Sequence, residues 1–174
     1  AEAQQLADSG VKEIIVIAQD ITRYGIDLYG ERKLPELLRA LCKMSFHWVR
    51  LHYLYPDEFT EELIDTIAEE EKILKYLDIP IQHCNDRVLK AMNRRGDKAE
   101  LMALFDTLRQ RITGLVLRTS LITGLPYEDE DAFDELCEFL SEVCIERAGV
   151  FPYSPEEGTA AAKMPERVDT AEAE

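Results

Sequence analysis

The sequence predicts an α/β fold, namely a partial, open TIM-like (β/α) barrel of parallel strands that is truncated at its N-terminus. Five apolar runs rich in β-branched and aromatic residues alternate with amphipathic helical stretches. Their starts lie about 28 to 40 residues apart, which is enough chain for a crossover helix between parallel strands. The leading segment EAQQLADSG is typical of a helix that would follow a missing first strand, with Ser9 and Gly10 as its stop.

Polar and apolar residues alternate along the expected strands. In the second strand, Arg50 and His52 share one face while Val49 and Leu51 share the other. This alternation indicates that one face packs against helices and that the other lines a ligand-binding cavity. We expect that cavity to receive Arg50, His52, Asp78, Gln82, Arg118 and Ser120. The expected strands are residues 11–19, 47–54, 75–83, 115–125 and 148–154.

Helices are expected in the gaps between these strands. Thr60 is a good N-cap for the second of them, since its hydroxyl can accept a hydrogen bond from a first-turn amide. The acidic run at 128–131 is expected to form the first turn of the last helix. That helix is expected to bury Phe133, Leu136, Cys137, Leu140 and Cys144. The expected helices are residues 34–42, a segment beginning at Thr60, and residues 86–93, 98–112 and 129–144.

The four cysteines are expected to be buried thiols. None of Cys42, Cys84, Cys137 and Cys144 belongs to a CxxC or CxxxCxxC cluster. Cys137 and Cys144 lie seven residues apart on one expected helix, and this separates them by about 10.5 Å along its axis. That distance is too long for a disulfide or for one shared metal ion. The sequence therefore predicts no metal site.

Charge and hydropathy exclude several classes of protein. The 174 residues contain 20 Lys and Arg against 35 Asp and Glu, a formal net charge of −15, which disfavours a nucleic-acid phosphate track and suits a basic partner. No apolar run approaches the length of a membrane span, and the N-terminus lacks the pattern of a signal peptide. The expected location is cytoplasmic. The absence of an initial Met and the final VDTAEAE indicate a piece of a longer protein.

Polar residues gather at the carboxyl ends of the expected strands. The chemistry of a TIM-like barrel lies at this end of its strands, so its mouth is the candidate site. The strand ends are Gln19-Asp20, His52-Tyr53, Gln82-His83, Gly124-Leu125-Pro126 and Tyr153-Ser154.

Strings at these strand ends resemble the radical S-adenosylmethionine (SAM) domain of the methylthiotransferases. They are KEIIVIAQDITRYG, WVRLHYLYP, YLDIPIQHCNDRVLKAMNRRG, LRTSLITGLP and GVFPYSPEEGTAAAKM. The resemblance runs from about Val11 to Met164 and implies an incomplete radical SAM barrel over residues 1–164. Residues 165–174 would then begin a C-terminal helix or linker.

The resemblance implies chemistry that this chain could perform only in part. Such enzymes hold a four-iron, four-sulfur cluster on a CxxxCxxC loop, and an electron passed to SAM releases a 5′-deoxyadenosyl radical that abstracts hydrogen from carbon. A second such cluster supplies sulfur. This chain lacks the CxxxCxxC segment, so we expect it to bind no cluster and to be inactive alone. It also has Pro126-Tyr127-Glu128 where the family usually has Pro-Gly-Glu, and Tyr adopts positive φ less freely than Gly.

The resemblance also implies site residues. SAM would be bound by Gln19, Gln82, His83, Arg118, Gly124 and Pro126, and the substrate would face His52, Tyr53 and Tyr55. Structural alternatives stay open: Arg118 could form an ion pair with Asp78, the histidines could be neutral lining residues, and the tyrosines could pack at the barrel rim.

The strings Tyr53-Leu54-Tyr55-Pro56 and Gln82-His83-Cys84-Asn85 resemble the branch that adds a methylthio group to the β-carbon of an aspartate in ribosomal protein S12. The implied partners are that basic protein and an electron donor for the cluster, with no membrane and no direct nucleic-acid contact from this segment. Three alternatives remain: a tRNA-modifying relative, a cluster-free interaction module, and a TIM-barrel enzyme without iron.

Overall fold

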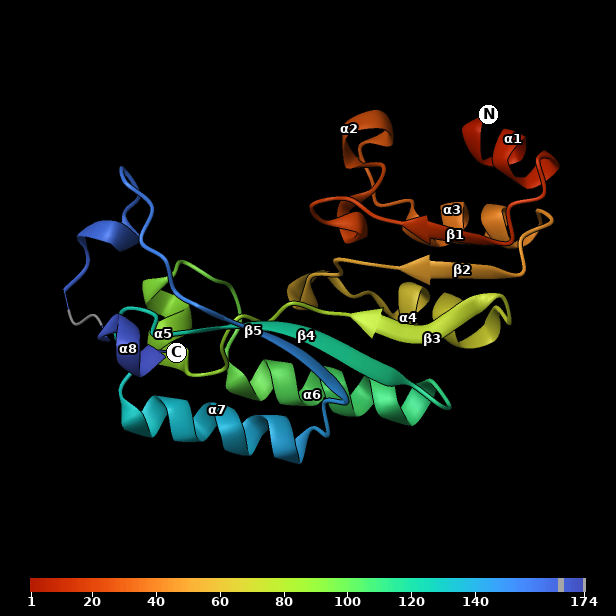
Figure 1. Cartoon of the computed structure of the whole chain (residues 1–174). Helices are drawn as coiled ribbons and strands as arrows, with labels where there is room; N and C mark the ends of the chain where they lie inside the picture. The colour runs from red at the N-terminus through yellow and green to blue at the C-terminus, as the bar shows by residue number, and fades with distance from the viewer. Residues whose placement is uncertain (166–167, 174) are drawn as a thin grey trace. The chain divides into compact units, whose positions relative to one another are not determined.

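The computed structural model describes residues 1–165 and 168–173 (Figure 1). The chain divides into two compact units. The first comprises residues 1–80 with 107–117, and the second comprises residues 81–106 with the described residues from 118 onward. Parallel strands and crossover helices occur in both units, which confirms the α/β class.

Three parallel strands form the sheet of the first unit. β1 (Glu13–Val16) pairs with β2 (Trp48–Leu51), and β2 pairs with β3 (Ile73–Asp78). The connections are helical, as parallel pairing requires. They contain α1 (Glu2–Asp8), η1 (Ile21–Arg23), α2 (Ile26–Tyr29), α3 (Leu34–Cys42), η2 (Pro56–Glu58) and α4 (Glu61–Glu69).

The second unit is built on a parallel pair of strands, β4 (Val116–Thr123) and β5 (Arg147–Pro152). The first two residues of β4, Val116 and Leu117, belong to the first unit. Gln82 adds an isolated parallel bridge to Leu121 of β4. The helices of this part of the chain are α5 (Asp86–Ala91), α6 (Lys98–Arg111), which crosses the unit boundary, α7 (Glu130–Glu142), η3 (Ala161–Lys163) and α8 (Thr170–Ala173).

Local sequence signals place the helix ends where they were expected. The Thr60 hydroxyl accepts a hydrogen bond from the Leu63 amide at the start of α4, which confirms the predicted cap. α1 ends at Asp8 with Ser9 as its C-cap, and Gly10 follows with φ +88°. The predicted stop of the leading helix is thereby confirmed. Among the described helices, none is long and apolar enough to cross a membrane.

The third strand differs from the prediction. It was expected at 75–83, but β3 begins at Ile73 and ends at Asp78. Pro80 explains the early end, because proline donates no ladder hydrogen bond and restricts the residue before it. Gln82 then adopts a left-handed conformation, with φ +68°. It therefore lies outside the strand whose alternation it was predicted to follow.

Strand faces follow the predicted register within each unit. Val49 and Leu51 of β2 are fully buried, while Arg50 and His52 are partly exposed. In β4, Leu117, Thr119 and Leu121 are buried and alternate with half-buried residues. This alternation of burial confirms which face of β2 and of β4 packs against the helices. The prediction that the polar residues of both units share one cavity stays a prediction.

The buried face of α7 differs from the prediction. Phe133, Cys137 and Cys144 were expected to be buried, yet all three are exposed. The helix is apolar on two sides, so periodicity alone did not show which side faces the core. The second side, with Phe133, Cys137 and Leu140, lines a groove of about 860 Å³ beside β4 and β5. The residues of α7 and its C-terminal end that are buried are Ala132, Leu136, Phe139 and Val143.

The four thiols therefore fall into two pairs with different expected reactivity. Burial raises the pKa of Cys84 to about 12, and burial with the neighbouring Glu70 carboxylate raises that of Cys42 to about 11. Both thiols stay protonated and covered at pH 8. We expect iodoacetamide at pH 8 to alkylate Cys137 and Cys144 in the native protein, and Cys42 and Cys84 only after unfolding in guanidinium. Peptide mass spectrometry measures this, and native labelling of Cys84 would contradict the burial.

Candidate functional site

A tight turn follows β4 at the carboxyl edge of the second unit. Gly124 has φ +76°, and a Cβ on it would lie 2.5 Å from the Cβ of Ala173, so no other residue fits there. The Glu128 amide donates to the Leu125 carbonyl at 3.0 Å, and the Gly124 amide donates to Oε1 of Glu128 at 2.8 Å. The Glu128 side chain thus folds back and holds the first amide of its own turn.

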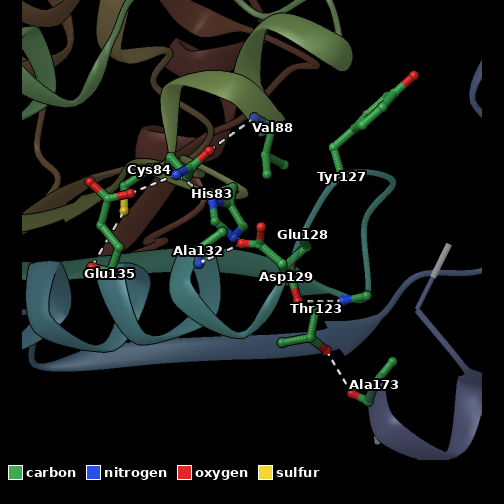
Figure 2. A network of polar contacts seen from close by, with 12 residues as sticks. His83, Cys84, Val88, Thr123, Tyr127, Glu128, Asp129, Ala132, Glu135 and Ala173 are labelled. Atoms are coloured by element: carbon green, nitrogen blue, oxygen red, sulfur yellow. Dashed lines mark hydrogen bonds and ion pairs between the residues drawn. The ribbon is translucent and has the colours of Figure 1, made fainter. Parts of the chain in front are cut away.

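His83 lies against the other oxygen of the same carboxylate (Figure 2). Its Nδ1 accepts a hydrogen bond from the Asn85 amide at 2.9 Å, so the neutral ring carries its proton on Nε2. Nε2 lies 3.2 Å from Oε2 of Glu128, and both side chains are buried. Glu128 therefore connects the segment before α5 with the turn after β4.

A second layer of polar contacts holds this segment in place. The Asn85 side chain caps α5 by accepting hydrogen bonds from the amides of Arg87 and Val88, and its Nδ2 donates to Glu135 at 2.6 Å. Lys98 also donates to Glu135, at 2.9 Å, and this hydrogen bond lowers the pKa of Glu135 and raises that of Lys98. Figure 2 shows the cluster between α5 and α7.

A cavity of about 250 Å³ opens beside His83. Most of its lining is apolar, with a few polar groups, which is typical of a small-molecule site. Its walls come from the segment before α5, from α5 and the residues that follow it, from the end of β4 and from the turn after β4. The lining residues are Gln82, His83, Val88, Leu89, Met92, Arg94, Ile122 and Leu125.

The structure brings together four of the residues expected to bind a cofactor. Gln82 and His83 line the cavity, and Gly124 is joined to His83 through Glu128. Pro126 is buried in the same turn. Arg118 lies on β4 and its Nη1 donates to the Ser120 hydroxyl at 3.3 Å. Their roles toward a cofactor stay predictions.

The other predicted residues lie in the first unit. Gln19 is exposed in the loop after β1, and Tyr53 is 42% exposed and has φ +61°. Tyr55 is half-buried beside η2. Nδ1 of His52 lies 3.4 Å from Oδ2 of the buried Asp78. The expected ion pair of Asp78 with Arg118, a residue of the second unit, stays a prediction.

A row of charged and aromatic side chains lies on the same face of the first sheet as His52. Nε of Arg50 donates to Oε1 of Glu13 at 2.5 Å, and the guanidinium lies 5.4 Å from the centroid of the Tyr76 ring. The His52 ring is 6.4 Å from that ring. The polar strand face of this unit is thus internally paired.

Glu128 was assigned to the first turn of a helix, and this assignment is wrong. α7 begins at Glu130 with Asp129 as its N-cap, and Glu128 precedes the helix and is buried. Glu130 and Asp131 do lie in the first turn of α7, where the helix dipole favours acidic side chains. That preference gives no information on the inward direction of the Glu128 side chain. The available signal was an acid four residues after a glycine that ends an apolar strand.

Tyr127 occupies a left-handed position, with φ +68°. Nη2 of Arg87 donates to its carbonyl at 2.9 Å, and the same guanidinium pairs with Asp129. The ring points away from His83 and Glu128 (Figure 2). The turn therefore keeps a backbone that glycine would adopt more easily, and the Arg87 contacts hold it there.

The sequence profile of the Radical SAM superfamily matches residues 1–140. The chain belongs to the radical SAM superfamily. It is 49% identical over 168 residues to "Ribosomal protein uS12 methylthiotransferase RimO" of Alkaliphilus oremlandii, and 53% identical over 169 residues to that of Pelotomaculum thermopropionicum. These alignments cover 96% and 97% of this chain but 38% of each relative. The chain thus spans about two fifths of the length of the relatives it matches.

Solved radical SAM structures share the fold. Coproporphyrinogen III oxidase (HemN) of Escherichia coli has a TM-score of 0.64 over 81% of this chain and 33% of its own, at 22% identity. The methyltransferase TsrM of Kitasatospora setae has a TM-score of 0.68 over 87% of this chain and 29% of its own, at 15% identity. The likeness confirms a partial, open TIM-like barrel.

The four cysteines are free thiols in the described part of the chain. Among the described residues, no group of three or more His, Cys, Asp or Glu side chains could hold a metal ion. Cys42 and Cys84 are buried, whereas Cys137 and Cys144 are exposed. The cysteines therefore do not fit an iron–sulfur cluster.

Removing the Glu128 carboxylate is expected to destabilise the second unit. In Glu128→Ala the buried Gly124 amide loses its acceptor and the His83 Nε2–H loses the carboxylate it faces, which should lower the free energy of unfolding by about 3 kcal/mol. Urea denaturation measures the change. Glu138→Ala, at an exposed position of α7, should cost less than about 0.5 kcal/mol. Equal effects of the two changes would show that the buried carboxylate carries no special stabilisation.

At position 127, glycine is expected to give a more stable protein than alanine. Glycine adopts the left-handed conformation without the penalty of a Cβ, so Tyr127→Gly should exceed Tyr127→Ala in unfolding free energy by about 1 kcal/mol. Alanine is the matched control because it removes the ring and keeps the Cβ. Thermal denaturation of both variants tests this, and equal stability would mean that the backbone at 127 is unstrained.

Proposed function

We propose that this chain is the central part of the catalytic barrel of a radical SAM methylthiotransferase that modifies ribosomal protein S12, at the β-carbon of an aspartate. The observation that carries the proposal is the identity of about half of the residues, across nearly the whole chain, to enzymes named uS12 methylthiotransferase RimO. The cavity and its polar network supply a site that suits such a role.

The cavity beside His83 fits the adenosine part of SAM. Ile122, Leu125 and Val88 offer an apolar wall for a flat base, and Gln82 offers amide groups for hydrogen bonds. Gly124 and Pro126 shape the adjoining turn, and Arg118, on β4 of the same unit, is our candidate for the carboxylate of SAM. When bound, SAM would supply the radical chemistry of the family.

His83 and Glu128 would act as positioning residues in this proposal. Each bonds to a different strand-end segment, and their contact fixes the turn against the start of α5. A turn that is already in place loses little conformational entropy when a ligand binds. His52, Tyr53 and Tyr55, at the carboxyl edge of the first unit, would face the protein substrate.

The clusters belong to parts of the protein beyond these residues. We infer that the complete gene product holds two four-iron, four-sulfur clusters and draws electrons from a reducing partner, whereas this chain alone holds neither. Because its substrate would be a ribosomal protein, we place the enzyme in the cytoplasm. The acidic balance of the chain, with a net charge of −15, suits a basic protein substrate.

The test is anaerobic turnover by the complete gene product after reconstitution with iron and sulfide. With SAM, a reductant and purified S12, we expect a methylthio group on one aspartate, located by peptide mass spectrometry. S12 with that aspartate changed to alanine is the control and should stay unmodified. A methylthio group on tRNA and none on S12 would replace this proposal by the tRNA-modifying one. Absence of SAM cleavage would overturn both.

A further inference from the structure

A glycine in the middle of β5 interrupts the side chains on one face of the second unit's strand pair. Gly149 is the register partner of Ser120 on β4. A Cβ on Gly149 would lie 3.4 Å from Cε2 of Phe151 and 3.5 Å from Nη2 of Arg118, and both are ordinary van der Waals distances. The glycine thus leaves a gap the size of a methyl group between a guanidinium and an aromatic ring.

Neither the backbone nor the pairing of β5 explains this glycine. The φ of Gly149 lies outside the left-handed region, so other residues would adopt its conformation without strain. β4 and β5 pair without a register shift from Arg118 with Arg147 to Thr123 with Pro152, so this described pairing has no bulge at Gly149. Glycine in a strand interior weakens the strand, and it often marks a place that a ligand approaches closely.

The guanidinium of Arg118 lies beside this gap. Its Nη1 donates to the Ser120 hydroxyl at 3.3 Å, and its Nη2 lies next to Gly149 of the neighbouring strand. The Arg118 side chain therefore extends from β4 toward β5 at the level of the Ser120–Gly149 pair. A guanidinium binds a carboxylate through two parallel hydrogen bonds, and such binding needs open space in front of its NH groups.

The gap and the cavity beside His83 lie on the same strand face. Ile122, which lines the cavity, follows Ser120 by two residues, so both side chains point to one side of the sheet. Two residues of a strand span about 6.6 Å. The Gln82 amide donates to the Ser120 carbonyl and the Gln82 carbonyl accepts from the Ile122 amide, each at 2.9 Å. A ligand with its adenosine in the cavity would thus place a short tail beside Arg118.

We propose that Gly149 is a positioning residue for the carboxylate of SAM. The inference rests on the proposed function, which assigns the cavity to adenosine and Arg118 to that carboxylate. Without a side chain at Gly149, a carboxylate oxygen is able to approach Nη2 of Arg118 and accept its hydrogen bond. A methyl group would occupy that place and accept no hydrogen bond, so it would separate the guanidinium from the carboxylate.

The test uses two ligands that differ in the carboxylate. S-adenosylhomocysteine carries the amino-acid tail, and 5′-methylthioadenosine lacks it. Isothermal titration calorimetry of the reconstituted complete gene product should show that Gly149→Ala raises Kd for S-adenosylhomocysteine at least fivefold and Kd for 5′-methylthioadenosine less than twofold. Ala148→Ser is the matched control, because it adds one heavy atom to the opposite face of the same strand, and it should change both Kd values less than twofold.

A double variant shows whether the methyl group acts through Arg118. Arg118→Gln should also weaken S-adenosylhomocysteine selectively. Adding Gly149→Ala to Arg118→Gln should then raise Kd less than twofold further, since the interaction that the methyl group disturbs is already absent. Two separate effects that multiply in the double variant would overturn the inference.

Stability separates a ligand role of Gly149 from a packing role. Gly149→Ala should keep or raise Tm, because alanine is favoured over glycine within a strand. If Tm falls because the methyl group crowds the Phe151 ring, adding Phe151→Ala should restore Tm while S-adenosylhomocysteine binding stays weak. Recovery of binding together with Tm would overturn the inference.

The failure of the inference differs from the failure of the proposed function. Unchanged S-adenosylhomocysteine affinity in Gly149→Ala, or equal weakening of both ligands, would refute the role of Gly149 and leave the proposed function standing. A wild-type protein that binds neither ligand would refute the proposed function, and the inference with it.

Discussion

The buried carboxylate of Glu128 is the interaction on which the second unit's site depends. It lies away from water; its Oε1 accepts a hydrogen bond from the Gly124 amide, and its Oε2 lies 3.2 Å from Nε2 of His83. Through these contacts it joins Gly124 to His83, which lie 41 positions apart in the sequence. The cavity beside His83 has its shape because those segments are held together.

The same constraint explains why the turn tolerates Tyr127. Left-handed backbone is unfavourable for a tyrosine, yet the position is held on both sides, by the Glu128 contacts and by the hydrogen bond from Arg87 to the Tyr127 carbonyl. A turn fixed by several hydrogen bonds can carry a residue that its backbone disfavours. Tyr127 therefore holds a left-handed conformation that glycine adopts more readily.

In the first unit, charged side chains lie on the polar face of the sheet, and each needs a partner there. A succession of pairwise contacts crosses this face of the sheet. It leads from Glu13 to Arg50, from Arg50 to the Tyr76 ring, from that ring to His52, and from His52 to Asp78. Pairing of this kind lowers the cost of desolvating each charge and fixes the rotamers at the strand ends. The loops that follow β1 and β2 then project from a rigid edge, which is what a surface for a macromolecular partner requires.

The sequence by itself determined the α/β class, the positions of most helices and the buried faces of β2 and β4, because these depend on periodicity, caps and proline, which act within a few residues. The tertiary structure alone decided which side of α7 is buried and where Glu128 points. α7 is apolar on both sides, so residues distant in the sequence decide which side is buried. Glu128 lies in an acidic run, and its inward direction likewise depends on distant residues such as His83. The left-handed Gln82 and the cavity beside it likewise arise from contacts between segments. Local patterns carry no information about such contacts.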